Sequence, residues 1–262
     1  ATSIGGIGIA ANTSWVREYD ACLSAELAIT AVQAAAKGFF AEADIEVKIV
    51  TIETGGGHTN AVLSGQAFAF IGGPEHNAYA KAKGAELRAV VNVVNKGNVY
   101  LVAQKGTSPR DRNFAAYVKG KRVATGLYSG TPNSITRYLL GQWGLDVKKD
   151  VMLMESTNAA LLAAMKTKNA DIAVVSEPTL TQGIRQGIWD EPFFNVPKEL
   201  GDYAYSTLNI RKESIDTEPQ VVAGFVKAIV KGLKFTYENP KQAAEIAKKE
   251  FPTMALEDLT AT

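Results

Sequence analysis

The sequence predicts an α/β fold built from two lobes of similar architecture. Short apolar runs typical of strands alternate with longer runs typical of helices, and this order favours sheets whose strands are largely parallel. The segments 64–91 and 167–194 share one pattern, which reads polar turn, apolar strand, turn with proline, helix, glycine and strand. Two amphipathic runs close the chain and predict a pair of C-terminal helices.

In the first half, the apolar and alternating runs predict strands separated by helices. The strands are expected at residues 4–10, 46–52, 68–71, 88–94 and 100–103. The helices are expected at residues 21–37, 60–64 and 75–83, with Gly38 at the C′ position of the first helix. The glycine-rich stretch 55–59 is expected to form a loop.

The second half continues this order and then ends in helices. Strands are expected at residues 123–125, 151–154, 172–175, 193–196 and 203–210. Helices are expected at residues 133–143, stopped by Gly144, at 159–166, and in a segment that ends near residue 186. Pro219 and Pro240 each fit the first turn of a C-terminal helix, where a missing N–H group costs nothing.

Composition and charge favour a globular protein without nucleic acid. Hydrophobic residues make up 46% of the 262 residues, and Lys and Arg number 28 against 27 Asp and Glu, so no strong field attracts nucleic acid or an anionic membrane. No run approaches the ~20 apolar residues of a membrane helix. The single cysteine, Cys22, excludes an intrachain disulfide. Trp143 and Trp189 are expected to pack in the core.

Candidate ligand-binding residues follow from the architecture. In open α/β sheets, ligands bind beyond the carboxyl ends of strands and near helix N-termini, so the loops that follow strands supply the candidates. These candidates are Asn12, Ser14, Trp15, Gly57, His58, Thr59, Pro74, Glu75, His76, Tyr128, Ser129, Thr131, Asn133 and Glu177.

Several candidates also have an ordinary structural interpretation. The glycines before His58 permit close backbone approach to a ligand, or they form a plain turn. His58 and His76 either contact the ligand or are solvated or capping loop residues. Glu75 and Glu177 either accept hydrogen bonds from a ligand amine or cap helix N-termini. These four residues match no standard zinc spacing, so no metal is expected.

The remaining candidates point to a polar or flat ligand. Ser129 and Thr131 precede an expected helix, where they present hydroxyl and N–H groups to a ligand or serve as N-cap residues. Trp15 and Tyr128 can stack on a flat ligand or simply pack. Arg137 lies one turn inside the same helix, and this position favours a solvated face over anion binding.

Five segments share their order and spacing with one known family. They are AAAKGFFAEADIEVKIV at 34–50, AVLSGQAFAFIGG at 61–73, VKGKRVATG at 118–126, AMKTKNADIAVVSEP at 164–178, and the C-terminal segment 219–251 with its Glu-Asn-Pro turn. In these segments the chain resembles the solute-binding proteins of ABC importers for sulfonates, taurine and thiamin pyrimidine precursors. One segment alone is a weak signal, but five in order are specific.

The resemblance implies a type II periplasmic-binding fold, in which two lobes are joined by two crossing strands and the ligand lies in the cleft. The crossings are then residues 99–104 and 203–210, lobe 1 comprises 1–101 and 204–262, and lobe 2 comprises 102–203. The resemblance further implies a monomeric, extracytoplasmic protein that is not an enzyme and uses no cofactor. Such a protein, free or tethered to the membrane, closes on a small polar solute and delivers it to an ABC permease of the inner membrane.

The chain departs from the family pattern in three places. The segment 13–24 is longer than expected between a first strand and a first helix. Ala67 and Phe68 stand where the family often has an acidic residue. The chain also ends soon after Phe251, where relatives continue with more helix, and this indicates a trimmed or incomplete C-terminus.

Two other functions stay open at this point. An enzyme of the same fold that makes thiamin pyrimidine would carry a cysteine-rich run, and this chain has Cys22 alone. A ligand-sensing module for a receptor is the second alternative. Among ligands, Glu75, Glu177, Trp15 and Tyr128 favour a nitrogen-bearing organic solute, such as a pyrimidine thiamin precursor, over a sulfonate.

Overall fold

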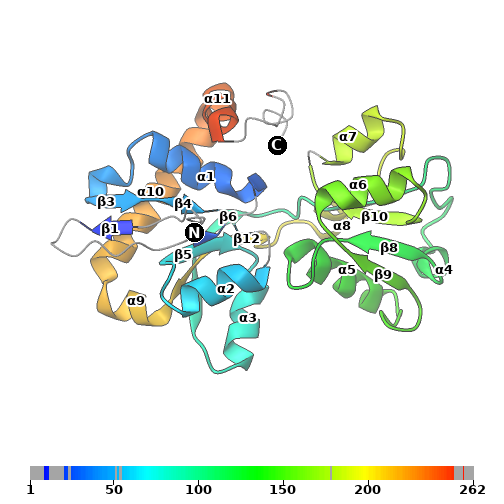
Figure 1. Cartoon of the computed structure of the whole chain (residues 1–262), viewed down its shortest axis with the longest axis horizontal. Helices are drawn as coiled ribbons and strands as arrows, with labels where there is room; N and C mark the ends of the chain where they lie inside the picture. Colours follow the sequence, from blue (N-terminus) through cyan, green and yellow to red (C-terminus); the bar gives the residue numbers. More distant parts are fainter. Residues whose placement is uncertain are drawn as a thin grey trace, which may run out of the picture. The chain divides into compact units, whose positions relative to one another are not determined.

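The computed structural model describes residues 9–11, 21–22, 25–50, 52, 55–177, 179–250 and 256. The chain divides into two compact units, of which the first comprises Ala1–Asn95 with Ala204–Thr262 and the second comprises Lys96–Tyr203 (Figure 1). Each unit contains both helices and strands, which confirms the predicted α/β class. Among the described residues, no helix combines the length and apolar character that crossing a membrane requires.

The first unit is built on a three-stranded sheet in the order β5-β12-β6. These strands are β5 (Ala69–Gly72), β12 (Ser206–Arg211) and β6 (Leu87–Val94), and β12 runs antiparallel to both neighbours. Two short pairs are β1 (Ile9–Ala11) with β3 (Ile45–Val47), antiparallel, and β2 (Ala21–Cys22) with β4 (Ile49–Val50), parallel. The helices are α1 (Ala25–Ala36), the 3-10 helix η1 (Ala41–Ala43), α2 (Gly55–Leu63), α3 (Glu75–Ala82), α9 (Lys212–Thr217), α10 (Pro219–Glu238) and α11 (Pro240–Glu250).

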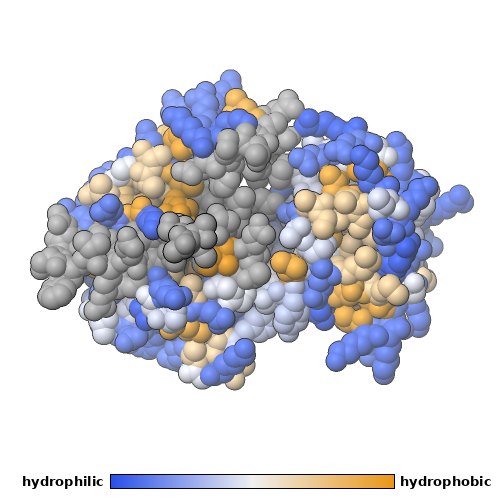
Figure 2. Space-filling model, viewed as in Figure 1, coloured by the Kyte–Doolittle hydropathy of each residue, from blue (hydrophilic) through white to orange (hydrophobic). Residues whose placement is uncertain are grey.

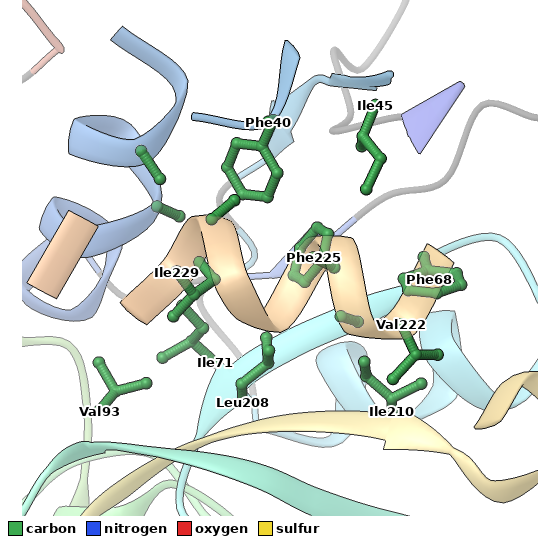
Figure 3. Packing of buried hydrophobic residues seen from close by; sticks show 14 of the residues in the cluster. Phe40, Ile45, Phe68, Ile71, Val93, Leu208, Ile210, Val222, Phe225 and Ile229 are labelled. Atoms are coloured by element: carbon green, nitrogen blue, oxygen red, sulfur yellow. The ribbon is translucent and has the colours of Figure 1, made fainter. Parts of the chain in front are cut away.

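The main core of the first unit lies where α10 packs against α1 and the sheet (Figure 3). Phe225 of α10 contacts the rings of Phe40 and Phe68, with ring centroids 4.8 and 5.7 Å away. The backbones of α1 and α10 approach closely at Gly232, where a Cβ atom would lie 2.7 Å from the carbonyl oxygen of Thr30. This close packing binds a C-terminal helix to the N-terminal half of the same unit.

The second unit contains a five-stranded sheet in the order β11-β7-β10-β8-β9. Its strands are β7 (Tyr100–Ala103), β8 (Arg122–Thr125), β9 (Met152–Glu155), β10 (Ile172–Val175) and β11 (Phe194–Asn195). Its helices are α4 (Phe114–Val118), α5 (Thr131–Gln142), α6 (Asn158–Lys166), α7 (Thr179–Arg185) and α8 (Val196–Leu200). On the face shown in Figure 2, hydrophilic residues line much of the outer edge of this unit, as expected for a surface in water.

The expectation of largely parallel strands is only partly correct. Strand β8 pairs in parallel with β9 and β10, so the carboxyl ends of these three strands share one edge of the sheet. Strand β7, however, runs antiparallel to β10 and β11, and β12 runs antiparallel to β5 and β6. The sequence pattern shows that a strand is buried but not the direction in which a distant segment returns to it.

Three local predictions in the first unit are also wrong. The glycine-rich stretch expected as a loop is helical, because α2 begins at Gly55 and buries a face formed by His58, Ala61 and Val62. Burial at i, i+3 and i+4 outweighs the poor helix propensity of the glycines. The helix expected from residue 21 begins at Ala25, after the short strand β2, and the strand expected at 46–52 is split into β3 and β4. Helices η1, α4, α8 and α9 were not predicted in either unit. Of the strand expected at 4–10, residues 4–8 lie outside the described part.

Candidate functional site

Some predicted ligand-binding residues cannot be placed. Asn12, Ser14 and Trp15 lie outside the described residues. The other candidates fall into two groups, one in each unit, and each group is described within its own unit.

In the first unit, α2 and α3 bring His58, Thr59 and His76 together. The rings of His58 and His76 have centroids 6.0 Å apart, and the ring of Phe70 on β5 lies 5.9 Å from the first and 5.6 Å from the second. The hydroxyl of Thr59 lies 3.3 Å from Nδ1 of His76. Nε2 of His58 is 2.8 Å from the carbonyl oxygen of Ile52. These three candidates, which the sequence analysis assigned to two separate loops, therefore lie in one cluster.

Both histidines are buried, and this contradicts the interpretation that they are solvated loop residues. His58 is 7% exposed and His76 is 3% exposed. Burial lowers the pKa of each histidine to about 4; for His58 the hydrogen bond to Ile52 opposes this shift and the nearby His76 adds to it. Both rings are therefore neutral at neutral pH.

The neutral state fixes the tautomer of His58. A carbonyl oxygen can only accept, so Nε2 of His58 carries the proton and donates it to Ile52. Nδ1 is then an acceptor, and it is buried without a hydrogen-bond partner among the described residues. The cluster thus holds one unused acceptor beside polar neighbours.

A polar network borders this cluster at the end of β5. Thr207 and Asn209 of β12 donate to the carbonyl oxygen of Gly72 over 3.2 and 3.4 Å, and Asn77 of α3 donates to Oδ1 of Asn209 over 2.9 Å. Sequence analysis missed these residues, although three polar side chains at 206, 207 and 209 inside an expected strand were a visible signal.

The other first-unit candidates lie at the starts of the same two helices. Gly57 is half-buried in the first turn of α2. Pro74 is the N-cap residue of α3, and Glu75 is its first residue, and both are half-buried.

In the second unit, the loop between β8 and α5 carries Tyr128 and Ser129, and Thr131 is the first residue of α5. Tyr128 is 66% exposed. Ser129 has φ 65°, in the left-handed region that non-glycine residues rarely adopt. Helix α5 begins at Thr131, not at 133 as predicted, and its N-cap residue is Gly130, with no side chain capping it. The N-cap interpretation of Ser129 is therefore wrong.

Asn133 lies behind this loop and joins a set of polar contacts at the ends of β8 and β9. It is 1% exposed and donates to the carbonyl oxygen of Gly126 over 2.9 Å and to Glu155 over 3.0 Å. Arg137 donates to Oδ1 of Asn133 and to Glu155, both over 2.7 Å. Its guanidinium carbon lies 5.3 Å from the ring centroid of Tyr128. Arg137 is half-buried and contacts Asn133, Glu155 and Tyr128, so the prediction that it lies on a solvated face is wrong.

Sequence analysis missed Glu155, although this residue directly follows the strand expected at 151–154. The strand was expected to end at 154, and β9 ends at Glu155. A carboxylate at the carboxyl end of a strand meets the same rule that selected the other candidates.

Glu177 follows β10, and it caps the helix after it. Its carboxylate accepts hydrogen bonds from the backbone N–H and the hydroxyl of Thr181, each over 3.1 Å. The capping interpretation of this residue is confirmed.

The helix cap formed by Glu177 is expected to stabilise the folded state. Replacing Glu177 with alanine is expected to lower the free energy of unfolding by about 1 kcal/mol, because an N–H group at the start of α7 loses its acceptor. Urea denaturation measures this, with Glu191→Ala, which removes an exposed carboxylate of the same unit, as the control. Equal unfolding midpoints for the two variants would contradict the cap.

No three His, Cys, Asp or Glu side chains within the described part of the chain lie close enough together to hold a metal ion. The polar and aromatic side chains described above, in each unit, can instead form hydrogen bonds with a ligand or contact a ligand ring.

Comparisons with known proteins place these features in a family context. A family model described as NMT1/THI5 like matches residues 28–243. A protein of Bacillus subtilis (strain 168), named "Putative binding protein YtlA", is 24% identical over 223 residues, which cover 83% of this chain and 65% of that protein. The chain thus spans less than two thirds of the length of this relative.

Two solved structures show the same fold. The periplasmic aliphatic sulphonate binding protein SsuA from Escherichia coli has a TM-score of 0.74 at 17% identity, over 90% of this chain and 79% of that one. The periplasmic nitrate-binding protein NrtA from Synechocystis PCC 6803 has a TM-score of 0.73 at 18% identity, over 89% of this chain and 66% of that one. The expected periplasmic-binding-protein fold is confirmed.

Proposed function

Because the chain belongs to the NMT1/THI5-like family, we propose that it is a binding protein that captures a small polar organic solute outside the cytoplasm and delivers it to an ABC importer. The names of the similar structures support this role, since they describe binding proteins for sulphonate and nitrate. The ABC permease is then a transient partner, and the protein acts as a monomer.

One structural observation carries the proposal. In the second unit, the parallel strands β8 and β9 end side by side, with Thr125 paired to Glu155. The loop with Tyr128 and Ser129 follows β8 directly, so polar and aromatic groups gather at the strand ends where α/β folds bind ligands. Asn133 ties this loop to Glu155, which makes the arrangement preformed.

The charges of this group favour a nitrogen-bearing organic solute over a sulfonate. A sulfonate needs cationic or N–H donors with unspent charge, and Arg137 is already paired with Glu155 over 2.7 Å. The hydrogen bonds from Asn133 and Arg137 both reach Oε1 of Glu155, which leaves Oε2 of this carboxylate at the strand end as an acceptor for a solute. Amines and ring nitrogens carry the donors that such acceptors bind.

Binding of a solute without a chemical reaction is the simplest role for these residues. A thiamin-pyrimidine synthase of the same fold is the competing proposal, and incubation with pyridoxal phosphate distinguishes the two. An imine absorbance with the full chain would support the enzyme.

A thermal-shift panel tests the binding role directly. Sulfonates, pyrimidines, nitrate and amino acids are each added to the full chain, and one class is expected to raise Tm. At a concentration 100 times Kd, a ligand that binds only the folded state adds about 2.7 kcal/mol to the free energy of unfolding. Calorimetry then gives the stoichiometry, which is expected to be one solute per chain. If no class shifts Tm at millimolar concentration, the proposal is contradicted.

A further inference from the structure

Tyr128 is an exposed aromatic residue whose surroundings are unusually well fixed. It exposes 66% of its surface from the loop that joins β8 to α5. A single exposed aromatic side chain is common in globular proteins and by itself indicates nothing. Three sets of contacts around it, however, hold both the backbone and the ring.

The first set fixes the loop backbone. The carbonyl of Gly126, before Tyr128, accepts a hydrogen bond of 2.9 Å from the buried Asn133. After Tyr128, the N–H of Gly130 donates to the carbonyl of Leu127 over 3.0 Å and closes a turn. A loop tied on both sides of one residue has little conformational entropy left to lose when a ligand binds.

The second set fixes the left-handed turn after the ring. Ser129 holds φ 65°, which costs free energy for a residue with a Cβ atom unless the surroundings enforce it. The carbonyl of Gly130 accepts from the N–H of Ser134 over 3.0 Å and from its hydroxyl over 3.2 Å, so α5 holds the end of the loop.

The third set fixes the ring itself. The guanidinium of Arg137 lies 5.3 Å from the ring centroid of Tyr128, which is within cation–π range. Arg137 is in turn held by Asn133 and by Glu155, each over 2.7 Å. Because the guanidinium lies over one face of the ring, a stacking partner has to use the opposite face.

From these contacts we propose that Tyr128 is a preformed stacking surface for a flat, unsaturated ring, and that Arg137 and Glu155 are positioning residues that set its orientation. This inference rests on the proposed solute-binding function and narrows its solute class to planar ring compounds. The ring stacks on the open face of Tyr128, where offset contact between two flat π-systems adds to the burial of apolar area. A puckered ring of the same size buries area but gains no such contact.

Matched pairs of solutes test the planar preference on the full chain. Benzenesulfonate is compared with cyclohexanesulfonate, and benzamide with cyclohexanecarboxamide, by calorimetry. Each pair shares its polar group and differs in the flatness of the ring. For at least one pair, the flat member is expected to bind about two- to tenfold more tightly, the range that aromatic pairs produce.

Substitutions then assign the preference to Tyr128. Tyr128→Phe is expected to retain the ratio of the two affinities, and Tyr128→Leu is expected to bring it to one. Glu155→Gln and Arg137→Met are expected to lower the ratio, a readout that a merely structural role would not move. Tyr138→Leu is the control, because Tyr138 lies on the same helix α5 and is 52% exposed.

The outcomes separate this inference from the wider function. Equal affinity for both members of every pair, including binding too weak to measure, overturns the stacking surface. So does a ratio that survives Tyr128→Leu or falls equally with Tyr138→Leu. If a solute without a ring raises Tm in the thermal-shift panel in any of these cases, the solute-binding function still stands.

Discussion

Replacing Gly183 with alanine is expected to lower the free energy of unfolding of the second unit by about 3 kcal/mol, the upper part of the range for overpacking. Gly183 lies in α7, and a Cβ atom there would sit 1.9 Å from Cε2 and Cζ2 of Trp189. Trp189 is 1% exposed, and its Nε1 donates to the carbonyl oxygen of Leu180 over 3.0 Å. The ring therefore cannot rotate away without losing its hydrogen bond inside a filled core.

Gly141→Ala is the matched control for this substitution. Gly141 lies in α5, and a Cβ atom there would meet nothing within 4 Å. The same added methyl group is expected to raise stability by up to about 1 kcal/mol, because alanine favours the helix and reduces the freedom of the unfolded chain. Urea denaturation followed by tryptophan fluorescence measures both variants. Similar effects of the two substitutions would show that Trp189 does not fill the space beside Gly183.

A double substitution locates the strain. Trp189→Leu is expected to cost several kcal/mol on its own, because it leaves a cavity in the core. In that background, adding Gly183→Ala is expected to cost little, since the atoms that the methyl group meets are gone. A full penalty in both backgrounds would place the strain elsewhere.

Prolines and glycines were the most informative residues for the ends of elements. Helices α10 and α11 begin at Pro219 and Pro240 as predicted. Gly38 and Gly144 follow helices with φ of 71° and 74°, as a residue that stops a helix in the left-handed region does. These positions could be predicted because their cause is local: a missing N–H group or a missing Cβ atom acts on the neighbouring residues only.

Contacts made across the sheet could not be predicted in the same way. Arg137 was read from its helical position alone, which says nothing of what lies opposite. Its partner Glu155 becomes available only because β8 pairs with β9 in a register that sets Thr125 beside Glu155. Register between strands depends on the packing of the whole unit, so the candidate loop was found from sequence and the residues that hold it were not.

The burial of the two histidines could not be predicted from the sequence for the same reason. His58 and His76 were expected in loops that follow strands, but the expected loop around His58 is the first turn of α2. Its helical turn places the side chain inside, beside Phe70 and His76. A sequence window rich in glycine carries no signal for such burial, because the partners come from β5 and α3.

Stability is expected to fall as the pH is lowered from 6.5 to 4, and these two buried histidines are the cause. In the folded state, burial lowers the pKa of each from 6.5 to about 4, so the unfolded chain binds more protons throughout this window. Their contribution is fully present above pH 6.5 and is lost as the pH falls towards 4. Between pH 8 and pH 5, these values correspond to about 2 kcal/mol for each histidine and about 4 kcal/mol for the pair.

The assignment is testable because the sequence contains only two histidines. Denaturation midpoints are measured at steps from pH 8 to pH 4.5 for the wild type, His58→Gln and His76→Gln. Each variant is expected to lose about half of the pH dependence, whatever its stability at pH 8, because a glutamine amide does not titrate.

Paired carboxylates act in a different part of the pH range. The pKa of Asp171 is held below its usual value of 3.8, chiefly by the hydrogen bond from Arg122, so this pair loses stability only as the pH falls below about 4. Paired glutamates such as Glu199, whose pKa is held below 4.5 chiefly by the hydrogen bond from Arg112, contribute only towards the lower end of the measured range. A decline between pH 6.5 and 5.5 therefore reports the histidines. A midpoint that stays constant across that interval would mean that His58 and His76 accept protons in the folded state as easily as in water, and the buried, neutral cluster beside β5 would have to be abandoned.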